Sequence, residues 1–173
     1  MQIRPVRPSE FAELGGMTVA AFQGLEGGGD LGDYAKTLAN VADRALHAQV
    51  LVAVEGDLLV GGVTYVPDRS NAYSEDLQEG EAGIRMLAVS PDARRRGAGR
   101  ALTEACIELA RVRGVRRLAL HSTPRMGAAH ALYESLGFRR APGRDLVVPP
   151  GLRLLSFVLD VTADGAERAQ PER

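Results

Sequence analysis

The chain lacks the features that would tie it to a membrane, a disulfide framework or a nucleic acid. Its single cysteine, Cys106, excludes an intrachain disulfide and a zinc site built from several cysteines. Its apolar runs fall short of the ~18 residues that a membrane-spanning helix needs, and its first residues lack the apolar core of a secretory signal. A formal net charge of −1 gives no overall attraction to nucleic acid or to an anionic membrane. We therefore expect a cytoplasmic protein with no membrane partner, no nucleic-acid partner and no metal.

The rest of the composition fits one globular domain. The chain has 173 residues, of which 45% are hydrophobic and 25% charged, values that are ordinary for a domain with a full core. Residues 162–173 are polar and show no periodicity, so we expect a disordered C-terminal tail after a single domain over residues 1–161. We find no internal repeat and no linker within that domain.

Apolar periodicity predicts alternating strands and helices. The expected strands are 3–6, 49–54, 58–66, 81–89, 115–121, 138–140 and 151–160. The expected helices are 8–22, 34–48, 99–113 and one that Thr123 caps, with Pro124 in its first turn, and that ends at Gly137. The strand–helix–strand order over 81–121 implies a parallel pair with a right-handed crossover. The fold class is therefore α/β, with a mixed sheet of the α+β kind.

Two helices carry an apolar stripe that indicates their buried face. In the helix over 34–48 the inward residues are expected to be Leu38, Val41, Ala45 and Leu46. In the helix over 99–113 they are expected to be Leu102, Ala105, Cys106, Leu109 and Val112. Because Cys106 falls on this stripe, we interpret it as a core residue and not as a nucleophile.

The segment between the strand over 84–89 and the following helix has the composition of an anion site. A Ser-Pro-Asp turn leads to Arg94-Arg95-Arg96 and then to Gly97-Ala98-Gly99, where the helix begins. Glycines leave backbone N–H groups open at a helix N-terminus, where they can bind phosphate oxygens, and the arginines add positive potential. A basic turn that only binds nucleic acid would not need these glycines. The segment therefore predicts a pyrophosphate site.

Two other phosphate-binding loops fit this segment less well. No Gly-Lys-Ser/Thr sequence is present, which excludes a Walker loop with its magnesium ligand. A dinucleotide-binding Gly-x-Gly-x-x-Gly would require a third glycine where the chain has Leu102.

Two motifs in this order resemble the GNAT superfamily of acyl-CoA-dependent N-acyltransferases. The first is Leu87-Ala88-Val89-Ser90-Pro91 followed by Arg94-Arg95-Arg96-Gly97-Ala98-Gly99. The second is Ala129-His130-Ala131-Leu132-Tyr133-Glu134-Ser135-Leu136-Gly137-Phe138. The resemblance covers roughly residues 2–160. It implies a strongly twisted central sheet with helices on both faces, and transfer of the acetyl group of acetyl-CoA to a small-molecule or peptide primary amine. Members of the family also form homodimers.

The resemblance assigns the cofactor-binding residues. Backbone amides of Arg95, Arg96, Gly97, Ala98, Gly99 and Arg100 would hold the pyrophosphate, with Arg94 beside them. The backbone of Leu87, Ala88 and Val89 would pair with the pantetheine as a further strand does. Met126, seven residues before Tyr133, stands where many members have an asparagine that contacts the cofactor. That contact is either lost or supplied by Ser122 or Arg125.

The resemblance also implies the catalytic groups. Tyr133 matches the general acid that protonates the departing thiolate. Some members have a glutamate on the strand before the glycine loop, but the corresponding residue here is Gly83. Three alternatives for the base stay open: Glu81 acting through water, His121 at the end of the next strand, whose unperturbed pKa of about 6.5 is suitable, or no dedicated base.

The acceptor side is the least defined. In the family it is built by the first two helices, their connecting loop and a late hairpin. Here these are the glycine-rich loop over 24–32, Tyr34 and the loop over 142–151, with Arg85 on the neighbouring strand. Glu26, Asp30 and Asp33 would suit a cationic amine.

Two alternatives to an enzyme remain at this point. A catalytically degenerate acyl-CoA-binding sensor is kept open by Gly83 and Met126. A nucleic-acid-binding module would use the arginine cluster, but the net charge of −1 argues against it.

Overall fold

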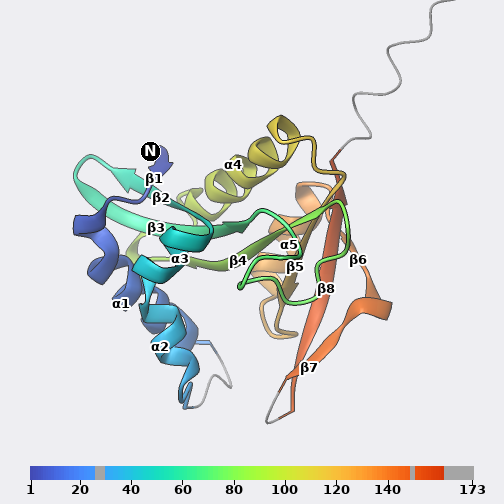
Figure 1. Cartoon of the computed structure of the whole chain (residues 1–173). Helices are drawn as coiled ribbons and strands as arrows, with labels where there is room; N and C mark the ends of the chain where they lie inside the picture. Colours follow the sequence, from blue (N-terminus) through green and yellow to red (C-terminus); the bar gives the residue numbers. More distant parts are fainter. Residues whose placement is uncertain (26–29, 149–150, 162–173) are drawn as a thin grey trace, which may run out of the picture.

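The computed structural model describes residues 1–25, 30–148 and 151–161 (Figure 1). Its helices are η1 (Pro8–Glu10), α1 (Phe11–Gln23), α2 (Tyr34–Ala39), α3 (Val41–His47), η2 (Pro91–Ala93), α4 (Ala98–Val112), α5 (Gly127–Ser135) and η3 (Pro142–Arg144). Its strands are β1 (Gln2–Pro5), β2 (Gln49–Glu55), β3 (Leu58–Val66), β4 (Glu81–Val89), β5 (Arg117–Ser122), β6 (Arg139–Arg140), β7 (Leu146–Val148) and β8 (Leu152–Asp160).

The strands form one mixed sheet in the order β1-β2-β3-β4-β5-β8-β6, with β7 paired to β8. Only the pairing of β4 with β5 is parallel among the ladders of the described residues, and α4 makes the crossover between them. The predicted α/β class with a mixed sheet is confirmed. The predicted hairpin of β2 and β3 is confirmed as well, and the sequence did not predict β7.

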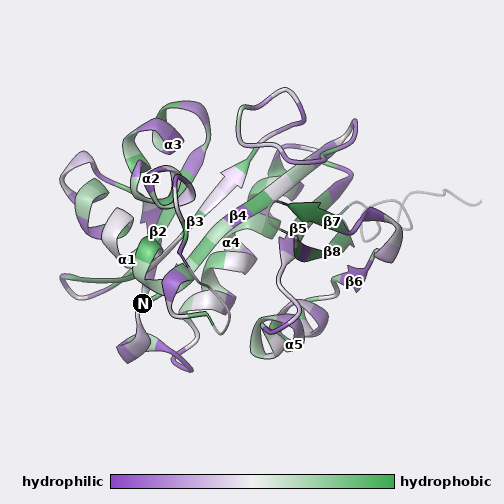
Figure 2. Cartoon of the chain, turned by 90° about the horizontal axis from the view of Figure 1, so that it is seen from below, coloured by the Kyte–Doolittle hydropathy of each residue, from purple (hydrophilic) through white to green (hydrophobic). Residues whose placement is uncertain are grey.

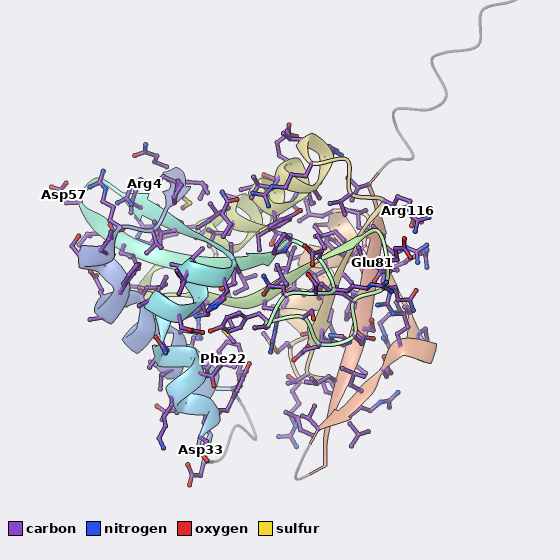
Figure 3. The ribbon with its side chains drawn as sticks, viewed as in Figure 1. Arg4, Phe22, Asp33, Asp57, Glu81 and Arg116 are labelled. Atoms are coloured by element: carbon purple, nitrogen blue, oxygen red, sulfur yellow. The ribbon has the colours of Figure 1, made fainter. Side chains whose placement is uncertain are left out.

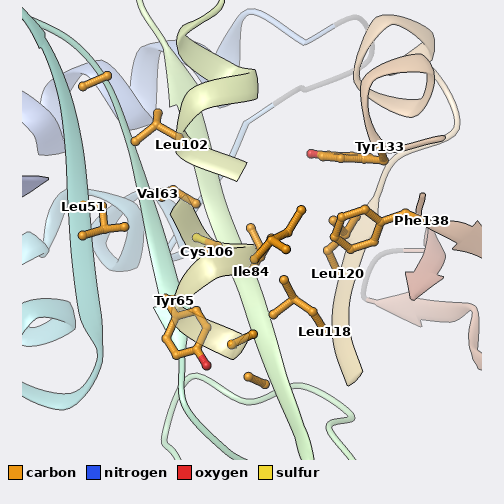
Figure 4. Packing of buried hydrophobic residues seen from close by; sticks show 14 of the residues in the cluster. Leu51, Val63, Tyr65, Ile84, Leu102, Cys106, Leu118, Leu120, Tyr133 and Phe138 are labelled. Atoms are coloured by element: carbon orange, nitrogen blue, oxygen red, sulfur yellow. The ribbon is translucent and has the colours of Figure 1, made fainter. Parts of the chain in front are cut away.

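The alternation of β2 explains why helices cover both faces of the sheet. Val50, Val52 and Val54 pack with α1 and α3, while Leu51 and Ala53 pack with α4. In Figure 2 hydrophobic colour follows the central strands, and the hydrophilic colour lies on the outer faces of helices and on loops. The larger core, on the α4 and α5 side, surrounds Cys106 (Figure 4), as the sequence indicated.

The helix expected over 34–48 is interrupted at Asn40, which is a correction. Asn40 has φ −82° and ψ 69°, and its side chain accepts a hydrogen bond from the Asp43 amide, so it ends α2 and caps α3. The buried Arg44 guanidinium donates to the Leu38 carbonyl, which has lost its helical donor at this break. Because the helix restarts with a new phase, Leu46 is 79% exposed and does not face inward.

The starts of two helices and the buried face of a third also differ from the expectation. The first helix begins as the short 3-10 turn η1 before α1. The helix after β5 begins at Gly127, with Met126 and not Thr123 at its N-cap. On α4 the buried stripe runs through Thr103, Ile107 and Ala110, so Val112 lies off it and is 76% exposed. The predicted tail and residues 26–29 of the predicted glycine-rich loop lie outside the described residues.

None of the helices in the described ranges combines the length and the apolarity needed to cross a bilayer.

Two adjacent glycines of α1 provide a test of the packing between α1 and α2. A Cβ at Gly15 would lie 2.4 Å from the Ala39 carbonyl oxygen, whereas a Cβ at Gly16 would have no atom within 4 Å. We expect Gly16→Ala to raise the free energy of unfolding by about 0.5–1 kcal/mol through helix propensity. We expect Gly15→Ala to lower it by about 1–3 kcal/mol, since backbone must move to admit the methyl group. Urea denaturation of both variants measures the difference, and equal effects would contradict the close contact.

Candidate active site

The site is created where β4 and β5 stop pairing. Their parallel ladder runs from Glu81↔Arg117 to Ile84↔Leu120. Beyond it β4 continues along β3 as far as Val89, and β5 continues along β8 as far as Ser122. The two strands therefore diverge, and the backbone of β4 after Ile84 has no strand partner on that side within the described residues.

A β-bulge on β4 accompanies this divergence. The register shifts from Thr64↔Arg85 to Gly62↔Ala88, so Met86 and Leu87 both lie opposite Val63. Met86 has a φ of 54°, which is uncommon for a residue with a side chain. A bulge bends its strand and increases its twist. It thereby turns the open backbone edge of Leu87, Ala88 and Val89 toward the gap.

The N-terminus of α4 lies at the end of this open edge. Gly97 is the N-cap with φ 87°, and no side chain caps the helix. The first helical bond runs from the Ala101 amide to the Gly97 carbonyl, so the amides of Ala98, Gly99 and Arg100 have no helical acceptor. These amides and the helix dipole give this helix end the open donors and the positive potential that the predicted anion site requires.

The arginines around this helix end differ in how free their guanidinium groups are to bind an anion. Arg94, Arg95 and Arg96 are all exposed. Arg96 is held by Glu55 at 2.6 Å, and Arg100 donates to the Ser135 hydroxyl at 2.6 Å. Arg94 and Arg95 make no ion pair with the described residues, so they are the arginines most available to an incoming anion.

Tyr133 lies on the α4 side of the gap. Its ring packs against Phe138 and Phe157, with centroids 5.9 and 5.8 Å away. In Figure 4 its hydroxyl points away from α5 toward β4 and α4. Burial raises the pKa of Tyr133 to about 12, so the phenol keeps its proton at neutral pH and is able to donate it.

Met126 lies at the start of α5, close to Ser122. The Ser122 hydroxyl donates to its sulfur at 3.5 Å and lies 3.1 Å from Nε2 of His130. The structure thus brings Met126 next to Ser122, one of the two residues that the sequence offered as a source of the missing contact, in one turn after β5. His130 is partly buried there and packs on Phe157.

His121 faces the opposite side of the sheet from Tyr133. Leu118 and Leu120 of β5 pack in the core with Tyr133, so the alternation of the strand turns His121 to the face that carries α1 and α2. There its Nδ1 lies 3.1 Å from Glu75 Oε2, and its Nε2 lies 3.5 Å from Asp76 Oδ1. Burial opposes the charged ring, but Glu75 and Asp76 outweigh it and raise the pKa of His121.

A small pocket opens beside His121. It is lined by residues of β3, of the segment before β4, of β4 and of β5, namely Val66, Tyr73, Ser74, Glu75, Asp76, Leu77, Gly83, Ile84, Arg85, Ala119, Leu120 and His121. A Cβ at Gly83 would lie 3.4 Å from the Leu77 side chain, so a leucine covers the position where the resemblance would place a glutamate. The sequence did not single out Glu75 and Asp76, because they lie in a turn-rich segment without motif or periodicity.

Of the predicted acceptor residues, Arg85 lines this pocket, and Tyr34 lies outside the lining but close to Arg85. Arg85 pairs with Glu75 at 2.7 Å and donates to the Tyr73 carbonyl. Tyr34 packs edge-on against Phe22, and its pKa is raised by burial and lowered in part by Arg85. Tyr34, Arg85 and His121 therefore all lie close to the carboxylate of Glu75.

The predicted acidic residues of the first loop do not join this group. Asp33 is exposed and pairs with Lys36, and Asp30 accepts from the Gly32 amide. Glu26 lies outside the described residues.

Glu81 lies outside the pocket lining. Both its oxygens accept from Arg144 at 2.9 Å, and one also accepts from the Gln78 amide. It begins β4 at the end of the sheet near Arg116 (Figure 3). Burial opposes its charge, but Arg144 outweighs burial and lowers the pKa of Glu81. This geometry gives Glu81 the role of tying η3 to β4, and it favours His121 over Glu81 among the predicted bases.

The ion pairs of His121 make a prediction for stability. Because the pKa of His121 in the folded protein is raised above its ordinary value, the charged ring stabilises the folded state. This contribution to the free energy of unfolding is fully present below about pH 6.5 and is lost as the pH rises through the folded pKa. The difference in free energy of unfolding between wild type and His121→Gln should therefore shrink as the pH rises from 6 to 9, measured by urea denaturation. A difference that grows with pH would contradict the ion pairing.

Comparison with known sequences supports one family. The sequence profile of the acetyltransferase (GNAT) family matches residues 22–138. The chain is 49% identical over 61 residues to the [ribosomal protein bS18]-alanine N-acetyltransferase of Escherichia coli strain K12, which is 35% of this chain and 41% of that protein. The chain thus matches less than half of the length of this curated relative.

Comparison with solved structures extends over nearly the whole chain. The ribosomal-protein-alanine N-acetyltransferase of Brucella melitensis has a TM-score of 0.68 at 25% identity, covering 92% of this chain and 99% of that one. The yncA protein of Salmonella typhimurium, solved with its cofactor acetyl-CoA, has a TM-score of 0.69 at 22% identity, covering 99% and 97%. The family profile, which spans more than half of the chain, and the shared fold agree: the chain belongs to the acetyltransferase (GNAT) family.

Proposed function

We propose that this chain is an N-acetyltransferase that transfers the acetyl group of acetyl-CoA to a primary amine. The observation that carries the proposal is the gap between β4 and β5, which has an anion-binding helix end and Tyr133 on one face and His121 with its pocket on the other. A thioester held in the gap would be reachable from both faces.

Acetyl-CoA fits the α4 face of the gap. The amides of Ala98, Gly99 and Arg100 would accept the pyrophosphate, and the open edge of β4 from Leu87 to Val89 would pair with the pantetheine amides. The presence of acetyl-CoA in a structural neighbour with a TM-score of 0.69 supports this assignment.

The chemistry is direct attack of the amine on the thioester, without an acyl-enzyme. The ammonium of the acceptor gives one proton to His121 Nε2, and the nitrogen lone pair forms a bond to the thioester carbonyl carbon. The carbon–sulfur bond breaks, and the Tyr133 hydroxyl protonates the leaving thiolate. The nitrogen then gives its second proton to solvent, and solvent returns a proton to the Tyr133 oxygen. His121 releases the proton on Nε2 to solvent. One proton is set free for each acetyl group transferred.

The acceptor is a small molecule or a peptide with a primary amine, and the names of the relatives, which act on the alanine of a ribosomal protein, support an amine of this kind.

The cytoplasm is the compartment we propose. Cys106 is buried in the core, where burial raises its pKa to about 12 and leaves it unreactive. A homodimer is carried over from the family resemblance.

Titration calorimetry with acetyl-CoA, with ATP as the phosphate control, tests the cofactor assignment. We expect selective binding of acetyl-CoA, and we expect Gly97→Ala to weaken it. The matched control is Gly114→Ala, because Gly97 and Gly114 flank the two ends of α4 with φ of 87° and 67° and open space around each. Both variants carry a similar backbone strain of about 1–2 kcal/mol, but only Gly97 lies at the anion site. Equal binding of ATP and acetyl-CoA would refute the assignment.

Replacement of Tyr133 by Phe tests the acid. We expect kcat to fall by about 10²- to 10⁴-fold, with acetyl-CoA affinity unchanged, in an assay of thiol release over a panel of amines. Tyr65→Phe is the control, because the Tyr65 hydroxyl is buried without a partner on the far part of the same core. Full activity of Tyr133→Phe would exclude the acid role. A wild-type protein that binds acetyl-CoA but acetylates no amine would be a sensor.

A further inference from the structure

The pocket beside His121 contains two buried polar atoms that no described residue satisfies. These are Asp76 Oδ1 and His121 Nε2, each without a hydrogen-bond partner and 3.5 Å apart. The His121 side chain is 9% exposed. Buried polar atoms are normally hydrogen-bonded, and two buried atoms without hydrogen bonds lower the stability of the folded protein. A ligand that donates hydrogen bonds to both atoms would remove this cost.

The other nitrogen of His121 is already engaged. Nδ1 lies 3.1 Å from Glu75 Oε2, and His121 lowers the pKa of Glu75 against the effect of its burial. An ionised Glu75 accepts the proton of Nδ1, which leaves the lone pair of a neutral ring on Nε2. In the neutral ring Nε2 therefore faces the pocket as an acceptor next to the acceptor Oδ1 of Asp76, whereas in the imidazolium it carries a proton toward that oxygen.

The walls of the pocket are apolar around this pair of acceptors. The apolar side chains on this face are Val66, Leu77 and Ala119, with Gly83 between them, whereas Ile84 and Leu120 line the pocket from strands whose alternation turns their side chains into the opposite core. Tyr73, Ser74 and Arg85 complete the lining. An apolar lining that ends in two acceptors, one of them a carboxylate oxygen, matches an aliphatic chain that ends in an ammonium group.

We propose that Asp76 and His121 bind the ammonium group of the acceptor in this pocket, with Glu75 positioning His121, and that the acceptor is an aliphatic primary amine without a carboxylate beside its nitrogen. This inference rests on the proposed function and specifies its acceptor. The ammonium donates to Asp76 Oδ1 and to His121 Nε2, and Nε2 takes the proton. The segment before β4 thus supplies the carboxylates that Gly83 cannot.

The charges around the pocket exclude a free amino acid. A carboxylate next to the amine would enter beside Glu75 and Asp76, and like charges at this range repel. The nearby arginines already face carboxylates: Arg85 pairs with Glu75, and Arg144 pairs bidentately with Glu81 and has its Nε 3.6 Å from Asp76 Oδ2. An amine whose neighbouring carbon carries a methylene or an amide meets no such repulsion.

A binding experiment tests the site without any turnover. The chain has three histidines, so the imidazole NMR signals are few, and His121→Gln identifies the signal of His121. The groups that face His121 are Glu75 and Asp76 and, from η3, Arg144 through a backbone hydrogen bond, with Arg85 reaching it through Glu75. Titration with n-butylammonium should shift the His121 signal and lower its apparent pKa, because the bound cation opposes a second charge.

Variants of the acidic segment complete this test. Asp76→Asn should weaken n-butylammonium binding roughly ten- to hundredfold, the value of a charged hydrogen bond. Glu79→Gln is the matched control on the same segment, because its carboxylate is 83% exposed. Alanine, which carries a carboxylate beside its nitrogen, should leave the His121 signal unchanged. The proposal is overturned if n-butylammonium does not affect His121, or if Asp76→Asn binds it as tightly as wild type.

Kinetics separate the positioning role of Glu75 from a structural one. In Glu75→Gln, the rise of kcat/KM with pH should occur at lower pH, because the raised pKa of His121 depends on that carboxylate. The affinity for acetyl-CoA should stay the same. Asp76→Asn should raise the KM for n-butylamine more than it lowers kcat. An unmoved pH profile rejects the role of Glu75. Binding without turnover in wild type would reject the proposed function but keep the site, whereas turnover unaffected by Asp76→Asn would reject the site alone.

Discussion

The divergence of β4 from β5 is the constraint on which the rest of the site depends. A parallel ladder that continued beyond Ile84↔Leu120 would occupy the backbone of β4 and leave no opening in the sheet. The bulge at Met86 and Leu87, which bends and twists β4, lies in the stretch where β4 no longer pairs with β5. In the proposed reaction, the same opening would allow groups on both faces of the sheet to reach one bond, which neither face could do alone.

The pKa values of the titratable groups on the two faces of the sheet are shifted by different physical causes. Tyr133 is surrounded by Phe138 and Phe157, so burial alone raises its pKa to about 12 and stabilises the neutral phenol. His121 is also buried, but carboxylates outweigh that burial and raise its pKa by stabilising the charged ring. A proton donor in apolar surroundings and a proton acceptor among carboxylates are therefore kept apart by the thickness of a sheet.

The sequence predicted one half of this site much better than the other. The glycine loop and Tyr133 could be found because helix ends and phosphate contacts impose local rules, such as the positive φ of Gly97. Glu75 and Asp76 could not, because their roles arise only when the irregular segment before β4 folds back over β5. The break at Asn40 was missed for a similar reason. Arg44 of α3 reaches the Leu38 carbonyl and Thr64 of β3, and such a tertiary contact overrides helix propensity.

A raised pKa of His121 agrees with the base role proposed for it, because the pocket could exchange one cation for another. Without an acceptor, Glu75 and Asp76 stabilise the imidazolium, which explains the raised pKa. An ammonium between Asp76 Oδ1 and Nε2 would supply the same positive charge, so the ring would no longer need to carry it and its proton would leave to solvent. The neutral ring would then take a proton from that ammonium as the nitrogen attacks. The net charge of the pocket would stay the same through the exchange, which avoids leaving an uncompensated charge in a buried site.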